Sequence, residues 1–103
     1  MSIIERNIDA IKRLCAVYAV AQMSVFGSVL TDRFNDDSDI DILVSFNALP
    51  VEGYAENYLQ LQESLQNLLG REIDLVEDKA IRNPVFREHV DRTKVQICFP
   101  EIA

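Results

Sequence analysis

The sequence predicts an α+β (α/β layered) domain, a short mixed sheet of about four strands with helices packed on one face. Two observations lead to this fold class. Helix-like and strand-like apolar patterns alternate along the 103 residues, and 49% of the residues are hydrophobic, which is enough for a core. The chain has no internal repeat and no linker-like segment, so residues 1–103 are expected to form a single domain.

The first quarter of the chain predicts a helix followed by a short strand. Apolar residues recur at helical spacing from Ile4 to Tyr18, so an amphipathic helix is expected to end near Ala21. Residues 23–26 predict a strand that stops at Gly27, because glycine favours turns over strand interiors.

A Gly-Ser turn and a second strand follow. Ser28 is expected to cap a short helix that runs to about Arg33, and the polar residues 35–38 predict a turn. Residues 39–46 give the clearest strand prediction in the chain. Apolar side chains recur there at every second position, namely at Ile40, Ile42, Val44 and Phe46.

The middle of the chain predicts a long helix and a third strand. A loop over residues 47–53 is expected to lead into a helix over residues 55–69, and Gly70 is well placed to stop that helix. Residues 71–77 then predict a strand with Asp74 on the face away from the core.

The last part of the chain predicts one more helix and one more strand. Asn83 and Pro84 form a helix-start signal, and the helix is expected to reach Asp91 or Arg92. Residues 95–99 predict the final strand, which Pro100 is expected to end.

Three aspartates are the candidate catalytic and metal-binding residues. Asp39 and Asp41 lie two apart on one predicted strand, so their side chains share a face. Asp74 joins them if its strand lies beside theirs. Packing does not favour holding repelling acids together, whereas a divalent cation explains it, and Mg²⁺ is the default ion. Three carboxylates fit a phosphoryl-transfer site with two ions.

A turn close to these acids completes the candidate site. Gly27 and Ser28 are the candidate nucleotide-binding residues, because a turn that opens a helix offers free backbone N–H groups to a phosphate. Arg33 is the candidate positive charge for the phosphates, and a solvent-facing role is its alternative. A metal site beside a phosphate-binding turn indicates a nucleotide site.

Composition and charge narrow the class of protein. The net charge of −7 and the isoelectric point near 4.5 disfavour a primary DNA or RNA binder and favour metals, metal–nucleotide complexes and basic proteins as partners. No signal peptide and no membrane-spanning run is visible, so a cytoplasmic protein is expected. Cys15 and Cys98 lack metal-ligand spacing and a disulfide framework, which predicts two buried thiols.

These motifs resemble those of a known family. Gly27-Ser28, ten residues, Asp39-Ile40-Asp41 and the later Asp74 are similar to the DNA polymerase β-like nucleotidyltransferases, and most closely to the minimal nucleotidyltransferase (MNT) subgroup. The resemblance runs from about residue 25 to residue 99. It implies the polymerase β-like fold, a nucleotide-binding turn at Gly27 and Ser28, and metal binding by the three aspartates.

The resemblance also implies a reaction and a partner. MNT proteins of this size typically act as antitoxins beside a HEPN-domain ribonuclease toxin. The implied reaction is the metal-dependent transfer of AMP from ATP to a tyrosine hydroxyl of the toxin. The expected partners are therefore a HEPN toxin and ATP, with no nucleic acid and no membrane, while the oligomeric state is left open.

Two other functions stay open, the first because of a departure from the family pattern and the second because an acidic surface attracts cationic substrates. Family members usually carry small or basic residues and a second glycine after the Gly-Ser pair, whereas this chain has the acidic Asp32 and no second glycine. The first alternative is a non-catalytic acidic antitoxin that neutralises the toxin by direct binding. The second is a nucleotidyltransferase for a cationic small molecule such as an aminoglycoside.

Overall fold

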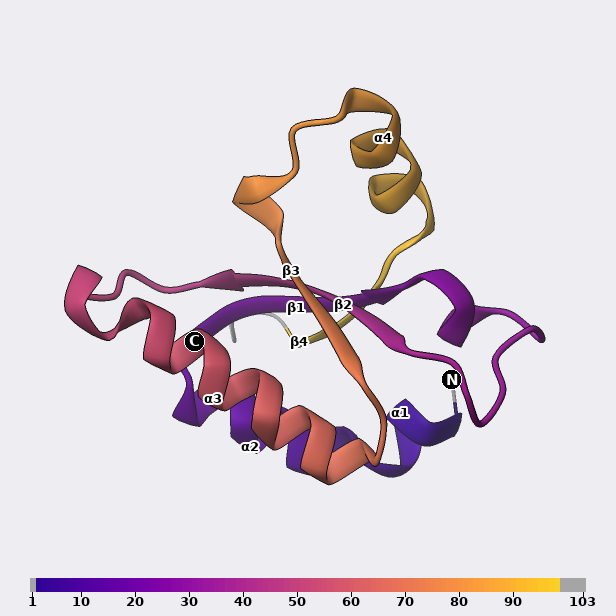
Figure 1. Ribbon diagram of the computed structural model, residues 1–103, viewed down its shortest axis with the longest axis horizontal. Coiled ribbons are helices and arrows are strands. Elements are labelled where there is room, and N and C mark those ends of the chain that lie inside the picture. The colour runs from indigo at the N-terminus through magenta and orange to yellow at the C-terminus, as the bar shows by residue number, and fades with distance from the viewer. Residues whose placement is uncertain (1, 99–103) are drawn as a thin grey trace, which may run out of the picture.

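A four-stranded mixed sheet forms the centre of the computed structural model, which describes residues 2–98 (Figure 1). The strands lie in the order β3-β2-β1-β4. Their bounds are β1 Val20–Phe26, β2 Ile40–Phe46, β3 Ile73–Glu77 and β4 Val95–Cys98. β1 pairs antiparallel with both β2 and β4, whereas β2 and β3 are parallel. The predicted mixed sheet of four strands is therefore confirmed.

Helices and short 3-10 turns connect the strands. The helices are α1 Ser2–Arg6, α2 Ile8–Val17, α3 Val51–Leu69 and α4 Pro84–Thr93, and the 3-10 turns are η1 Gly27–Leu30 and η2 Asp78–Ala80. None of the helices within residues 2–98 has the length and apolar character needed to cross a membrane. The parallel pair β2 and β3 is joined by α3, as a parallel crossover requires.

The main core lies between the sheet and the helices α2 and α3, which share one side of it (Figure 1). Its fully buried side chains come from both layers, namely Ile4, Ile11, Leu61 and Leu65 from the helices and Val25, Ile40, Ile42 and Val44 from the sheet. The alternating strand pattern of the sequence thus predicts the buried face of β2 correctly.

The opposite face of the sheet carries α4. Val90 of α4 is fully buried and packs in a second apolar cluster with Phe26 and Leu43. Leu43 points to this face because it alternates with Ile42 and Val44 along β2. The two long helices thus share one face of the sheet, and α4 covers part of the other.

The first predicted helix ends earlier than expected. It is divided at Asn7, whose side-chain amide donates a hydrogen bond of 2.8 Å to the carbonyl oxygen of Ile3, and it stops at Val17 rather than near Ala21. Ala19 adopts a left-handed backbone with φ of 58°, which turns the chain from the helix into β1. The apolar residues after Val17 fit a buried strand as well as a helix, so spacing alone misplaces the boundary.

Other boundaries also differ from the predictions. The predicted loop over residues 47–53 is wrong at its end, because α3 begins at Val51 and includes Gly53 in its first turn. The short helix expected to reach Arg33 is only the four-residue η1. Gly70 does end α3. It has φ of 66°, and its N–H donates a hydrogen bond to the carbonyl oxygen of Gln66. The predicted end of the last strand, residues 99–100, lies outside the described residues.

Candidate active site

The two central aspartates lie opposite each other on neighbouring strands. In the parallel register of β2 and β3, Asp41 pairs with Asp74. Ile40 and Ile42 on either side of Asp41 are buried in the main core, so the Asp41 carboxylate points to the α4 face. Asp74 lies between the buried residues Ile73 and Leu75 and points to the same face. The predicted convergence of Asp41 and Asp74 from neighbouring strands is thus present.

The electrostatics of Asp41 reflect this crowding. Partial burial of its carboxylate, the charges of Asp74 and Asp39 and a hydrogen bond with Asp74 together raise the pKa of Asp41 to about 6. Asp39 itself lies one residue before β2 and is exposed. Asp74 and Asp39 therefore both act on the Asp41 carboxylate.

Gly27 brings the chain directly against the Asp41 carboxylate. Phe26 pairs with Asp41 across β1 and β2, so the next residue, Gly27, begins its turn beside that side chain. A Cβ atom at position 27 would lie 3.3 Å from the Asp41 Cγ and would overlap Oδ2. Gly27 also has φ of +76°, a conformation that L residues rarely adopt. Glycine is thus required at position 27 for two reasons, namely the left-handed backbone and the nearby Asp41 carboxylate.

Ser28 sits in the turn that follows, but this turn is not the opening of a regular helix. The Ser28 carbonyl accepts hydrogen bonds from the Thr31 N–H and the Thr31 hydroxyl, both at 2.9 Å. These bonds close the 3-10 turn η1 after four residues. Arg33 lies beyond it in an exposed loop, and the structure gives it no contact with the three aspartates within residues 2–98.

An arginine that the sequence did not single out fixes the loop before Asp39. The Arg71 guanidinium donates to the carbonyl oxygens of Asn35 and Ser38, at 2.6 and 3.0 Å, and lies 4.5 Å from the ring centroid of Phe34. Its side chain is only 16% exposed. A single arginine after a helix matches no motif, so the sequence does not predict this role. The fold shows that Arg71 holds the loop that leads into Asp39.

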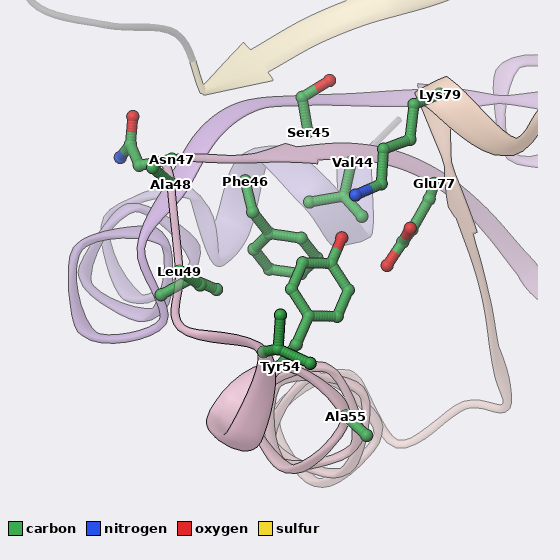
Figure 2. Close-up of a pocket in the computed structure, with 11 residues that line it drawn as sticks. Val44, Ser45, Phe46, Asn47, Ala48, Leu49, Tyr54, Ala55, Glu77 and Lys79 are labelled. Carbon is green, nitrogen blue, oxygen red and sulfur yellow. The ribbon is translucent and has the colours of Figure 1, made fainter.

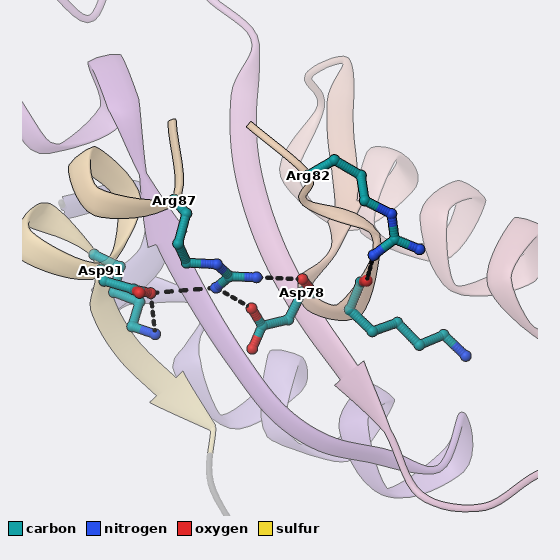
Figure 3. Close-up of polar contacts among 6 residues, drawn as sticks. Asp78, Arg82, Arg87 and Asp91 are labelled. Atoms are coloured by element: carbon teal, nitrogen blue, oxygen red, sulfur yellow. Dashed lines mark hydrogen bonds and ion pairs between the residues drawn. The ribbon is translucent and has the colours of Figure 1, made fainter. Parts of the chain in front are cut away.

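A second polar network holds α4 over the aspartate face (Figure 3). Arg87 of α4 bonds to the Asp78 carboxylate and, through its other terminal nitrogen, to the Asp78 carbonyl oxygen. Asp91 lies 3.3 Å from the same guanidinium and 3.2 Å from the Lys94 ammonium. These contacts join α4 to the end of β3, close in sequence to Asp74.

An aromatic pair borders the site on the same face. The rings of Phe26 and Phe86 meet edge to face, with centroids 5.9 Å apart. Phe26 is buried and stands opposite Asp41 in the β1–β2 register, whereas Phe86 of α4 is 37% exposed. Across the sheet, Asp41 on β2 therefore lies between Phe26 on β1 and Asp74 on β3.

The donor chemistry of this site fits a hard divalent cation. Asp41 and Asp74 are neighbours, Asp39 raises the pKa of Asp41, and carboxylate oxygens are the ligands that Mg²⁺ prefers. Within the described part of the chain, no group of three or more Asp, Glu, His or Cys side chains is close enough to hold a metal ion. Metal binding by the three aspartates thus stays a prediction.

A cavity of about 820 Å³ opens elsewhere, between the end of β2 and the start of α3 (Figure 2). Tyr54 points into it from α3, beside Phe46, and the Lys79 ammonium lies 4.6 Å from the Tyr54 ring centroid. None of the three aspartates lines this cavity. Cavity size alone would therefore misplace the candidate active site, which is an open, charged surface.

Comparison with known proteins assigns the family. Residues 8–98 match the family model of the nucleotidyltransferase domain. A Methanocaldococcus jannaschii protein provisionally named a protein adenylyltransferase is 32% identical over 80 residues, which are 78% of this chain and 79% of that protein. The protein adenylyltransferase MntA of Thermococcus cleftensis is 34% identical over 74 residues, or 72% of each chain.

Solved structures with the same fold include a minimal nucleotidyltransferase and two toxin–antitoxin complexes. The first superimposes with a TM-score of 0.74 at 30% identity, covering 89% of this chain and 90% of that one. A toxin–antitoxin with AMP-PNP gives 0.70 at 22% identity, covering 92% and 75%. A complex of the tri-AMPylated Shewanella oneidensis HEPN toxin with MNT antitoxin gives 0.64 at 22% identity, covering 93% and 72%.

The two complexes share the fold with this chain, whereas the family model and the more similar relatives extend the likeness to sequence. The matched range, residues 8–98, includes the positions of the glycine bend and of all three aspartates. The chain therefore belongs to the nucleotidyltransferase domain family and has the fold of a minimal nucleotidyltransferase.

Proposed function

We propose that this chain is an antitoxin adenylyltransferase that transfers AMP from ATP to a tyrosine hydroxyl of a HEPN ribonuclease toxin. One observation carries the proposal, namely the pairing of Asp41 with Asp74 against the backbone of Gly27. The names of the relatives support the reaction, and the complexes with the same fold support the partner and the nucleotide.

The proposed site divides the reaction among this chain's residues. Asp39, Asp41 and Asp74 would hold Mg²⁺, with two ions expected, and the metal would supply positive charge to the phosphates. Gly27 and Ser28 offer backbone N–H groups to the triphosphate, and Arg33 is the proposed additional positive charge. The acceptor oxygen attacks the α-phosphorus as pyrophosphate leaves, and Asp74 takes the hydroxyl proton.

Asp41 connects this proposal to the electrostatics of the site. Its pKa of about 6 means that a fraction of the carboxylate is protonated near neutral pH when the aspartates have no counter-charge. A divalent cation favours the ionised form and displaces that proton. Cation binding is therefore expected to release protons and to weaken as the pH falls below 6.

The proposal is tested by incubating the chain with ATP, Mg²⁺ and the HEPN-domain protein that the proposal expects to be encoded beside it. Intact mass analysis of the HEPN protein should show one or more added AMP units, and peptide analysis should place them on tyrosine. Asp41→Asn should lower the transfer rate by at least about 100-fold, and excess EDTA should stop the transfer. The matched control is Asp9→Asn, which changes an exposed acid on α2 and should transfer at the wild-type rate. An unmodified HEPN protein after incubation with folded wild-type chain would refute the proposal.

A second candidate function follows from the charge of the chain. The net charge of −7 and the acidic Asp32 after the Gly-Ser turn favour an antitoxin that neutralises a basic toxin by covering it. Protection of cells from the toxin separates the two functions. Full protection by a folded Asp41→Asn chain would support direct binding, whereas loss of protection would support catalysis.

A further inference from the structure

The two cysteines, 83 positions apart in the sequence, meet inside the fold. Cys15 lies on α2 and Cys98 on β4, and their sulfur atoms are 2.8 Å apart. The sequence predicts two separate buried thiols, and the burial is confirmed, at 6% and 7% exposure. Their contact has no signal in the sequence, because it arises from the packing of α2 under the edge of the sheet.

The sheet register explains why the two sulfurs are held together. Met23 in the middle of β1 pairs with Cys98, and its sulfur lies 3.9 Å from the Cys15 sulfur. All three side chains belong to the main core between sheet and helices. The contact is therefore fixed by two elements of regular structure rather than by a loop.

We propose that Cys15 and Cys98 form a reversible disulfide, which makes this pair an oxidative modification site of the folded protein. The two sulfurs already lie close to the bonded separation of about 2.05 Å, so small side-chain movements join them. Neither residue takes part in the proposed nucleotide transfer. The disulfide proposal therefore does not rest on the function proposed above.

The oxidant is a low-molecular-weight disulfide such as glutathione disulfide. A thiolate of the protein attacks one sulfur of glutathione disulfide, which forms a mixed disulfide and releases one glutathione thiolate. The second protein thiolate then attacks the protein sulfur of the mixed disulfide and releases the second glutathione. Two protein thiols lose two protons and two electrons, and one glutathione disulfide becomes two glutathione thiols.

Cys98 is the first nucleophile of this sequence. The Cys15 thiol donates a hydrogen bond to the Cys98 sulfur and lowers the pKa of Cys98, and the charge of Lys12 acts in the same direction. Cys98 also ends the four-residue strand β4, which pairs with β1 at one edge of the sheet. Local opening of a short edge strand exposes Cys98 before the helix-borne Cys15.

The bond would connect α2 to β4 and would thereby also restrain α4, which immediately precedes β4. Since α4 packs over the aspartate face through Val90 and Phe86, oxidation would reduce the movement of one wall of the candidate active site. The closed loop spans most of the chain, which favours a stabilising bond.

The test uses the full chain, folded in buffer without reductant, and glutathione disulfide as the probe. After incubation, free thiols are alkylated in denaturant and the intact mass is measured. Wild-type chain should carry no alkyl group and should weigh less than the reduced chain by two hydrogen atoms. Subsequent dithiothreitol treatment should restore two alkylation sites.

Two variants separate the steps. In Cys15→Ala the attacking Cys98 remains, so the mixed disulfide with glutathione should accumulate as a glutathione adduct. In Cys98→Ala the buried Cys15 should react at least about 10-fold more slowly. Circular dichroism before and after incubation shows whether the chain is folded.

Three results would overturn the proposal. The first is wild-type chain that keeps two alkylatable thiols after incubation. The second is a disulfide that forms only in urea, and the third is a disulfide between two chains, which doubles the mass.

Discussion

At the scale of single residues, Gly27 and Asp41 constrain each other through close contact. The left-handed backbone of Gly27 and the nearness of the Asp41 carboxylate are separate demands on the same position. The chain offers a matched set of glycines with which to separate them. Gly70 has a similar φ of 66° but open space around it, and Gly53 has neither feature.

Alanine at each glycine should give three different stabilities. Gly27→Ala should lower the free energy of unfolding by about 2–5 kcal/mol, because backbone strain and overlap with Asp41 add. Gly70→Ala should lower it by about 1–2 kcal/mol through strain alone. Gly53→Ala should raise it by up to about 1 kcal/mol, because alanine favours the helix. Urea unfolding followed by circular dichroism measures all three, and equal losses at positions 27 and 70 would contradict the overlap with Asp41.

The raised pKa of Asp41 makes stability depend on pH. The folded carboxylate has a pKa of about 6 against an ordinary value of 3.8, so between these values the folded chain binds more protons than the unfolded chain. The contribution of Asp41 to the free energy of unfolding must therefore fall as the pH rises from about 4 to 6, and must stay at its lower level above 6.

Asp41→Asn removes this contribution. Relative to the variant, wild-type chain should lose stability between pH 4 and pH 7 in thermal or urea unfolding without divalent cations. Asp9→Asn on the exposed face of α2 serves as the control and should run parallel to wild type. A constant difference between wild type and Asp41→Asn across this range would show that the carboxylate is not crowded.

At the scale of elements, α4 packs on the face of the sheet to which Asp41 and Asp74 point. It starts at the Asn83 cap, whose side-chain oxygen accepts hydrogen bonds from the N–H groups of Val85 and Phe86. Its main apolar anchor is the fully buried Val90. A short helix with one deeply buried residue depends strongly on its capping and polar contacts.

The cap should therefore have a measurable effect. Asn83→Ala should lower the free energy of unfolding by about 1 kcal/mol, because two N–H groups lose their acceptor. Asn83→Asp keeps an acceptor at the same place and should stay close to wild type. Hydrogen exchange of the amides in residues 84–93 locates the change, and equal protection in the alanine variant would contradict the capping role.

The elements also show which features a sequence can predict. The alternation of Ile40, Ile42 and Val44 places the Asp41 carboxylate on the correct face, because the strand period is fixed by backbone geometry. The bracketing of Asp74 by Ile73 and Leu75 does the same for β3. The order of helices and strands and the Asn83 helix start follow from equally local signals.

Other features depend on contacts between distant parts of the chain. The helix that stops at Val17 depends on the left-handed Ala19, and alanine carries no signal for that conformation. The hold of Arg71 on the loop before Asp39 and the meeting of Cys15 with Cys98 exist only after folding. Single-sequence patterns report local preference, so they cannot reveal such pairs.

At the scale of the whole molecule, we propose that residues 1–103 form one cooperative domain. The sheet is continuous, and residues 8–98 match a single family model. One main core joins α2, α3 and all four strands. A second, smaller apolar cluster joins α4 to β1 and β2.

Cooperativity can be measured with the chain's own signals. Far-ultraviolet circular dichroism follows the helices and strands, and fluorescence of the three tyrosines follows the packing, since the chain contains no tryptophan. Urea unfolding curves from the two signals should coincide in midpoint and slope. Separate midpoints would show that α4 or another part unfolds on its own.

The parallel pairing of β2 with β3 has a consequence for the route by which the chain folds. The antiparallel pair β1–β2 closes across residues 27–39, whereas β3 pairs with β2 only across the longer segment that contains α3. Repulsion between Asp41 and Asp74 is therefore absent while only β1 and β2 are paired. It begins when β3 pairs with β2. The carboxylates of the proposed site are therefore expected to slow a late step of assembly, and mild acid should speed refolding.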